Sequence, residues 1–236
     1  MSGSYLKECW YCDEMVVLNV PSLKNRIFHD ECFGDYQKEK EEEKEEYVRL
    51  KIEIMYERSL RMLEKQEGVC LAEYKEAAEV VRDLARKDTS KFDSSHEMIA
   101  AMELINNRIS TKVQYSVGRK RVDMLLPDLK VALEIDGHLH QFRIGKDSER
   151  DVEILNTLNE KESGWEMVRI PTKFIEKNVS KLVPAIKAIH REKQSLRAKN
   201  GGFIPSYYSR HNLSAQLQAL DGVNDKTKTT YEILEE

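Results

Sequence analysis

The sequence lacks any long run of apolar residues. None of its stretches approaches the roughly 18–20 apolar residues that cross a bilayer, so no transmembrane helix is expected. The first residues, 1–6, also lack a basic region followed by an apolar stretch, which is the mark of a secretory signal. We therefore expect an intracellular, cytoplasmic protein that has no membrane partner.

An excess of charge of one sign is also missing. The 236 residues contain 38 Lys and Arg against 42 Asp and Glu, which leaves a formal net charge of -4. The whole chain therefore lacks the basic surplus of many nucleic-acid-binding proteins, although a basic strip can lie on an acidic protein. With 40% hydrophobic and 34% charged residues, the composition fits a globular protein and argues against full disorder.

Cysteine is scarce, but its spacing is informative. Cys9-Trp-Tyr-Cys12 and His29-Asp-Glu-Cys32 form two ligand pairs separated by 16 residues. In a reducing compartment such pairs point to a tetrahedral Zn²⁺ site of the Cys₃His type, although incidental spacing is an alternative. The zinc segment could read DNA, bind a protein partner or brace the next helix. Cys70 stands alone and is expected to be a buried helix residue.

The composition divides the chain into four segments: a zinc-finger-like segment (1–35), a helical spacer (36–89), a mixed core (90–178), and a helix with a polar tail (179–236). The spacer begins with an unbroken run of good helix formers, residues 37–46, and Gly68 interrupts it. Two apolar sets follow helical spacing there, namely Val48, Ile52, Met55, Ser59 and Met62, and Tyr47, Leu50 and Ile54. A solvated spacer and a coiled-coil-like segment that binds a second copy or a protein partner both fit.

Residues 90–178 predict a mixed α/β core in the order α-β-β-β-α-β. The helices are expected at about Ser94–Asn107 and Ser148–Lys161, the second one stopped by Ser163-Gly164. The strands are expected at Lys112–Val117, Arg121–Leu126, Val131–Asp136 and Trp165–Ile170, the last one ended by Pro171. Trp165 precedes an apolar strand, so we interpret it as a core residue.

Pro127-Asp128 is a turn signal between two of these strands and predicts a hairpin. If its centre lies between Asp128 and Leu129, residues whose numbers sum to 257 face each other. Asp123 then lies opposite Glu134, and strand alternation adds Asp136 to the same face. The alternate positions, Val131, Leu133 and Ile135, are directed to the core.

Three carboxylates on one face of a hairpin repel one another, so they need compensation. A divalent cation such as Mg²⁺ or Mn²⁺, which prefers hard oxygen ligands, provides it directly. The alternative is a solvent-facing polar side with salt bridges to nearby cations, namely Arg119, Lys120, Arg121 or Lys130.

Asp123, ten residues, and then Glu134-Ile-Asp136 resemble the PD-(D/E)xK nuclease signature. Three longer runs are similar to the very-short-patch-repair endonuclease branch of the restriction-endonuclease-like superfamily: Glu134-Ile-Asp-Gly-His-Leu-His140, Asp147-Ser-Glu-Arg150 and Gly164-Trp-Glu-Met-Val-Arg169. The resemblance covers about residues 92–176. It implies a restriction-endonuclease-like core, a metal-dependent DNA endonuclease and a bacterial or phage origin, with Mg²⁺ at Asp123, Glu134 and Asp136.

The same resemblance assigns two further catalytic residues. It places Glu97 at the site, although Ser94-x-x-Glu97 is also a capping box that would explain this glutamate without a site role. Asp136 stands where the usual lysine would be, and His140 matches the histidine that this branch uses for proton transfer. His138 is two residues away. If no group replaces the lysine, the chain could be a non-catalytic DNA-binding or assembly factor built on a decayed nuclease core.

Five cations are candidate DNA contacts. Arg119, Lys120 and Arg121 are consecutive beside the acidic strand and could bind phosphates, or form an ordinary charged turn. Arg150 and Arg169 could grip either the active-site carboxylates or the scissile phosphate. A third interpretation of the chain, a purely structural zinc-helix adaptor, leaves the acidic hairpin unexplained.

Overall fold

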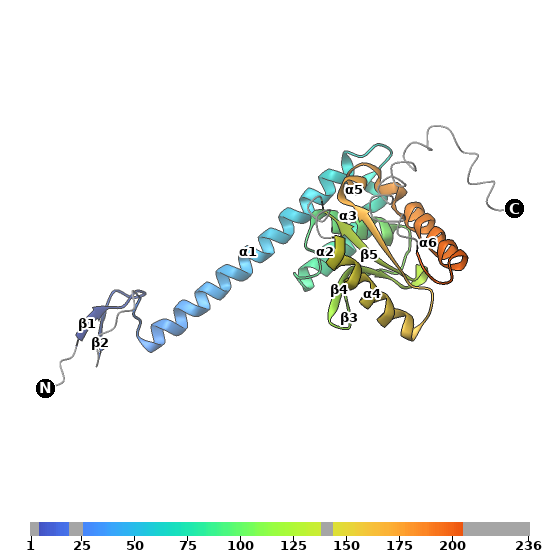
Figure 1. The fold of residues 1–236 in the computed structure, drawn as a ribbon. Coiled ribbons are helices and arrows are strands. Elements are labelled where there is room, and N and C mark those ends of the chain that lie inside the picture. The colour runs from blue at the N-terminus through green and yellow to red at the C-terminus, as the bar shows by residue number, and fades with distance from the viewer. Residues whose placement is uncertain (1–4, 19–25, 138–143, 205–236) are drawn as a thin grey trace. The chain divides into compact units, whose positions relative to one another are not determined.

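The structure is a computed structural model that describes residues 5–18, 26–137 and 144–204 (Figure 1). The chain forms two compact units, Met1–Lys51 and Ile52–Glu236, whose boundary falls inside the helix α1 (Asp30–Glu64). Among the described residues, no helix is long and apolar enough to cross a membrane.

The first unit is built on a small β-hairpin. Strands β1 (Tyr5–Glu8) and β2 (Met15–Leu18) pair antiparallel, with Leu6 opposite Val17. Helix α1 begins at Asp30, earlier than the expected end of the zinc-finger-like segment at residue 35, so Cys32 lies in its first turn. The buried core of this unit is small and consists of Cys9, Val16 and Ile27.

The expected helical spacer is present as α1, a short 3₁₀ helix η1 (Leu71–Tyr74) and α2 (Lys75–Lys87). Gly68 lies in the interruption with a φ of 75°, a left-handed conformation that glycine adopts without steric cost. The prediction for Cys70 is wrong: it is exposed and precedes η1. The chain has already left α1 at this point, so Cys70 has no helix face to bury it.

The second unit contains a four-stranded mixed sheet in the order β3-β4-β5-β6. Its strands are β3 (Lys112–Val117), β4 (Lys120–Leu126), β5 (Val131–Asp136) and β6 (Glu166–Pro171), with helix α3 (Ser95–Asn106) before them and α4 (Ile144–Lys161) between the last two. The first three strands are antiparallel and β5 pairs parallel with β6. The predicted element order is confirmed, although α4 begins four residues before the predicted Ser148.

Helices cover both faces of this sheet. On one face Val131 and Leu133 pack into the main core with α2, α3 and two C-terminal helices, α5 (Thr172–Asn178) and α6 (Leu182–Lys199). On the other face Ala132 packs into a smaller core with residues of α4. Trp165 belongs to this smaller core, as predicted. Sequence reasoning missed α5, which directly follows β6.

The outer edge of β6 is covered by polar side chains of α6. Lys193 donates to the carbonyl oxygen of Met167 at 2.5 Å, and Gln194 donates to that of Gly164 at 3.1 Å. Arg197 forms an ion pair with Glu166, which is buried. Backbone groups that an edge strand would expose thus gain partners within the unit.

Candidate functional site

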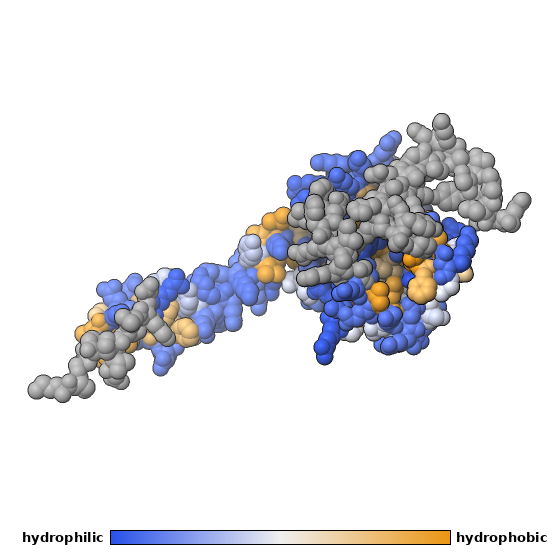
Figure 2. Space-filling view, in the orientation of Figure 1, coloured by the Kyte–Doolittle hydropathy of each residue, from blue (hydrophilic) through white to orange (hydrophobic). Residues whose placement is uncertain are grey.

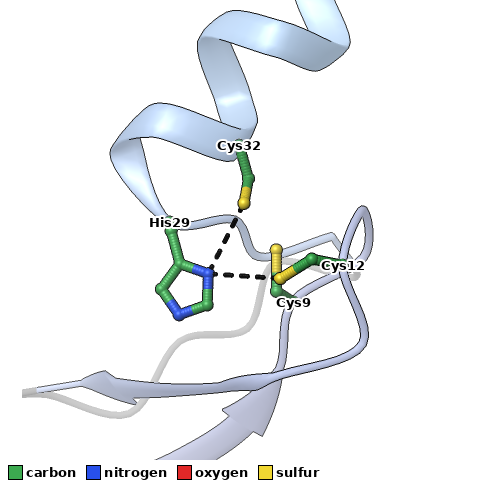
Figure 3. Close-up of side chains that lie close together, drawn as sticks. All are labelled: Cys9, Cys12, His29 and Cys32. Atoms are coloured by element: carbon green, nitrogen blue, oxygen red, sulfur yellow. Dashed lines mark hydrogen bonds between the residues drawn. The ribbon is translucent and has the colours of Figure 1, made fainter.

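The four predicted zinc ligands lie together in the first unit (Figure 3). The ligand atoms of Cys9, Cys12, His29 and Cys32 are all within 4.8 Å of one another. Cys9 and Cys12 come from the segment between β1 and β2, His29 directly precedes α1, and Cys32 lies in its first turn. The hairpin and the helix end therefore each supply one ligand pair.

The distances in this cluster match those of a tetrahedral zinc centre. Zn–S and Zn–N bonds of roughly 2.3 and 2.05 Å place sulfur and nitrogen about 3.6 Å apart. The Nδ1 atom of His29 lies 3.6 Å from the Sγ of Cys12 and 3.7 Å from the Sγ of Cys32. The other ring nitrogen, Nε2, lies 3.4 Å from the carbonyl oxygen of Met15, so the tautomer protonated at Nε2 leaves Nδ1 available to a metal.

The electrostatics of the cysteines also fit a cation. Burial acts to raise the pKa of the Cys9 thiol, but backbone hydrogen bonds from Cys12, Tyr11 and His29 outweigh it and bring the pKa to about 6. For Cys32, burial and the neighbouring cysteines raise the pKa to about 12. The negative charge of one thiolate thus makes ionisation of a second thiol unfavourable, unless a cation neutralises them. These four side chains could bind a metal ion such as zinc.

The acidic hairpin of the second unit has the predicted register. Three pairs sum to 257, namely Met124–Leu133, Leu125–Ala132 and Leu126–Val131. The turn is a short 3₁₀ segment over Pro127–Leu129, and Lys130 closes it with a left-handed φ of 51°. Within residues 26–137 the ladder stops before Asp123, whose carboxylate instead accepts a hydrogen bond of 2.8 Å from the backbone N–H of Ile135.

Beside Asp123 the sheet is distorted. In the β3–β4 ladder, Gln114 and Asp123 form the one facing pair that is skipped in the described strands, and Gln114 has a φ of 45°. Val113 packs in the main core, whereas Tyr115 packs against the smaller core on the opposite face. The strand therefore turns over at Gln114, a strained conformation of the kind that collects at functional sites. Sequence reasoning missed this residue.

Glu97 lies behind this distortion, with only 6% of its surface exposed. Its carboxylate accepts hydrogen bonds from the backbone N–H of Asp93 at 3.0 Å, the hydroxyl of Ser94 at 2.8 Å and the amide of Gln114 at 2.8 Å. The Ser94 hydroxyl in turn accepts from the Glu97 N–H, which is the N-cap half of the predicted capping box. The return bond of the Glu97 carboxylate goes to the N–H of Asp93, one residue before the cap. The contact with Gln114 exceeds what capping needs, and it ties Glu97 to the strand next to Asp123.

Asp123 has a strongly perturbed acidity. Burial of its carboxyl is the main reason that its pKa rises from 3.8 to about 7, and the negative charges of Glu97 and Glu134 raise it further. The hydrogen bond from Ile135 and the positive charge of Arg150 act in the opposite direction. Asp123 is thus a carboxyl that changes its charge near neutral pH.

Arg169 joins the remaining carboxylates. Its side chain, 6% exposed, donates to Glu134 at 2.9 Å and to Asp136 at 3.0 Å. It also forms an ion pair with Asp151 on α4, and its Nε lies 3.1 Å from that carboxylate. Arg150 binds the second oxygen of Glu134 at 2.6 Å. Of the two roles considered for these arginines, the contacts correspond to holding carboxylates. The part of Asp151 was not predicted.

The other predicted site residues are placed less centrally. Arg121 pairs with Asp93 at 3.0 Å and Lys120 pairs with Glu153 at 3.3 Å. These ion pairs within the chain correspond to the alternative of an ordinary charged turn. Arg119 is exposed in the turn between β3 and β4. His140 and its neighbour His138 lie outside the described residues.

The metal-binding capacity of the two sites differs. Among the residues that the structure describes, the Cys₃His cluster is the only group of three or more possible ligands that converges. Asp123, Glu134 and Asp136 do not form such a group among these residues. Arg150 and Arg169 bind Glu134, and Arg169 also binds Asp136. The predicted Mg²⁺ site and the PD-(D/E)xK assignment therefore stay predictions. Comparison with known proteins finds no matching family model, no matching curated protein and no matching solved structure.

Proposed function

We propose that this chain is a metal-dependent DNA endonuclease that hydrolyses phosphodiester bonds. The observation that carries the proposal is the state of Asp123. Its carboxyl lies partly buried in a distorted sheet, its pKa is raised to about 7, and the charges of Glu97 and Glu134 contribute to that rise. A fold retains so unfavourable a carboxylate cluster most readily where a divalent cation compensates it.

The donor set fits a hard cation. Glu97, Asp123, Glu134 and Asp136 offer only carboxylate oxygens, which Mg²⁺ and Mn²⁺ prefer. When bound, the metal would activate water and stabilise charge on the phosphodiester. Arg169 holds both Glu134 and Asp136, so a cation has to compete with this arginine. We therefore expect weak binding of the metal in the absence of DNA.

The arginines suit a phosphate as a second partner. The side chain of Arg150 is 29% exposed, so it can bind Glu134 and still reach an incoming anion. Arg119, exposed in the β3–β4 turn, would bind DNA phosphates and so add affinity for DNA of any sequence. Arg169 is too deeply buried for this role, and we assign it to holding Glu134, Asp136 and Asp151 in place. His140 is the proposed proton carrier.

A second function is favoured by a specific observation. The three hairpin carboxylates do not converge among the described residues, and Asp136 replaces the usual lysine. These features also fit a DNA-binding or assembly factor whose nuclease core has lost its activity. The two proposals differ in whether the protein cleaves the DNA that it binds.

Cleavage assays on linear, nicked, mismatched and branched DNA, with and without Mg²⁺ or Mn²⁺, separate them. We expect metal-dependent cleavage by the wild type and a loss of at least about 100-fold in Asp123→Asn, which removes a charged ligand. Asp83→Asn, an exposed position on α2, is the matched control and should cleave normally. Equal cleavage by wild type and Asp123→Asn would refute the nuclease site, whereas binding without cleavage would favour the assembly factor.

A further inference from the structure

Helix α1 carries an apolar stripe formed by Tyr47, Leu50 and Ile54. Their side chains are 67%, 58% and 60% exposed. Spacings of three and four residues place them on one side of the helix. In heptad notation they occupy positions a, d and a. Figure 2 shows hydrophobic surface part-way along α1, between hydrophilic stretches. Large apolar side chains that line up in this way are typical of a surface that binds another helix.

This stripe is separate from the face that α1 buries within the fold. Ile52, Tyr56, Ser59 and Leu63 are the buried residues of α1, and Ile52, Tyr56 and Leu63 belong to the main core. They follow their own helical spacing, offset by two residues from the stripe. Folding of one chain therefore accounts for one apolar face of α1 and leaves the other exposed.

The charges beside the stripe are sorted by sign. Lys44, Lys51 and Arg58 occupy the e positions, whereas Glu39, Glu46 and Glu53 occupy the g positions. Charges away from the stripe pair along the helix, as Lys38 does with Glu42 and Glu45 with Arg49. Beside the stripe, Glu53 is already paired with Arg82 and Arg86 of α2 and is not available to a partner. Within the described residues, by contrast, Lys44, Glu46 and Lys51 take part in no ion pair, so their charges remain available to a partner.

We propose that α1 binds α1 of a second copy of this chain as a parallel, in-register helix pair. In that arrangement Tyr47, Leu50 and Ile54 each meet their own equivalents. Glu46 of each copy lies beside Lys51 of the other, and Glu39 beside Lys44, because g and e' positions are neighbours in parallel pairs. An antiparallel pair would bring Glu beside Glu and Lys beside Lys. Leucine at d and a β-branched residue at a also favour two parallel strands.

The length of the stripe sets the strength of the pair. Towards the N-terminus the next a and d positions are Lys40 and Glu43, which form an ion pair with each other. Towards the C-terminus they are Glu57 and Arg61. The apolar contact therefore extends over fewer than two heptads, and we expect a reversible dimer whose population depends on protein concentration.

Sedimentation velocity of the full chain with bound zinc tests the surface. The wild type should shift from monomer to dimer as the protein concentration rises to about 0.1 mM. Leu50→Glu should weaken the dimer by about 100-fold or more, since it buries a charge at the centre of the stripe. Arg49→Glu is the matched control, because its side chain is 76% exposed on another side of the helix, and it should dimerise as the wild type does. Circular dichroism should show equal helix content in all three.

Charge reversal tests the orientation. Glu46→Lys places like charges together in a parallel pair and should weaken the dimer by about 10-fold, whereas Glu46→Lys with Lys51→Glu should restore it. A wild type that stays monomeric, or a Leu50→Glu variant that dimerises normally, would overturn the proposal. Failure of the double variant to recover would overturn the parallel orientation. None of these outcomes depends on nuclease activity.

Discussion

The raised pKa of Asp123 predicts a pH-dependent stability that a single substitution should remove. The folded state binds this proton more tightly than the unfolded chain, because the pKa rises from 3.8 to about 7. The stabilising contribution is therefore present at low pH and is lost as the pH rises through about 7. Between pH 5 and pH 8 these two values correspond to a loss of at most about 3 kcal/mol in the free energy of unfolding. Asp123→Asn carries no charge and should show no such loss.

Urea denaturation of the zinc-loaded protein at pH 5 and pH 8 measures this difference. Trp165 is buried in the smaller core of the second unit, so its fluorescence reports unfolding of that unit. The other tryptophan, Trp10, is half exposed in the first unit and can be replaced by phenylalanine in every variant. The change in the free energy of unfolding between pH 5 and pH 8 is measured for both proteins, and the value for Asp123→Asn is subtracted from the value for the protein with Asp123. The contributions of groups that titrate in both proteins then cancel.

Two results would refute this reasoning. One is an equal pH dependence with and without the Asp123→Asn substitution in the same background, which would mean that the carboxyl has an ordinary pKa. The other is a stability that rises with pH only when Asp123 is present, which would mean that its charged form is favoured by the fold. Asp83→Asn again serves as control, because this side chain is exposed on α2.

Three further substitutions have defined outcomes. Cys12→Ser should lower bound zinc, measured by elemental analysis, well below one per chain, whereas Cys70→Ser should leave it unchanged because Cys70 lies outside the cluster. Arg169→Met should reduce the free energy of unfolding by about 3 kcal/mol in urea, since it removes the buried cation shared by Glu134, Asp136 and Asp151 and leaves only Glu134 with a second arginine. Gln114→Gly should be more stable than Gln114→Ala by about 1 kcal/mol, because only glycine adopts a φ of 45° without strain.

The predictable parts of this fold are those set by local chemistry. The Pro127-Asp128 turn defines the hairpin centre, and once the centre is known, strand geometry gives the three pairs from Met124–Leu133 to Leu126–Val131, although the predicted pair Asp123–Glu134 lies beyond the end of this ladder. The cluster of possible zinc ligands could be predicted because two-residue gaps between ligands suit a tetrahedral metal. In both cases the constraint is contained in short motifs: one turn for the hairpin, and two ligand pairs for the metal cluster.

The parts that escaped prediction depend on distant contacts. Gln114 has a left-handed backbone in a sequence that reads as an ordinary strand, and its amide binds Glu97 on α3. Arg169 on β6 pairs with Asp151 on α4, and this contact depends on the packing of the two elements in the fold. No local propensity contains such information, and the centre of the candidate site consists largely of contacts of this kind.

The polar covering of β6 bears on how this protein can be shortened. Lys193 and Gln194 satisfy carbonyl groups at the edge of the sheet, so a chain cut before α6 would present a bare strand. Bare strands recruit one another, and such a fragment would aggregate through its sheet. A shortened chain should therefore keep all of α6, whose last residue is Lys199. Otherwise aggregation through the exposed strand would obscure the dimer proposed for α1.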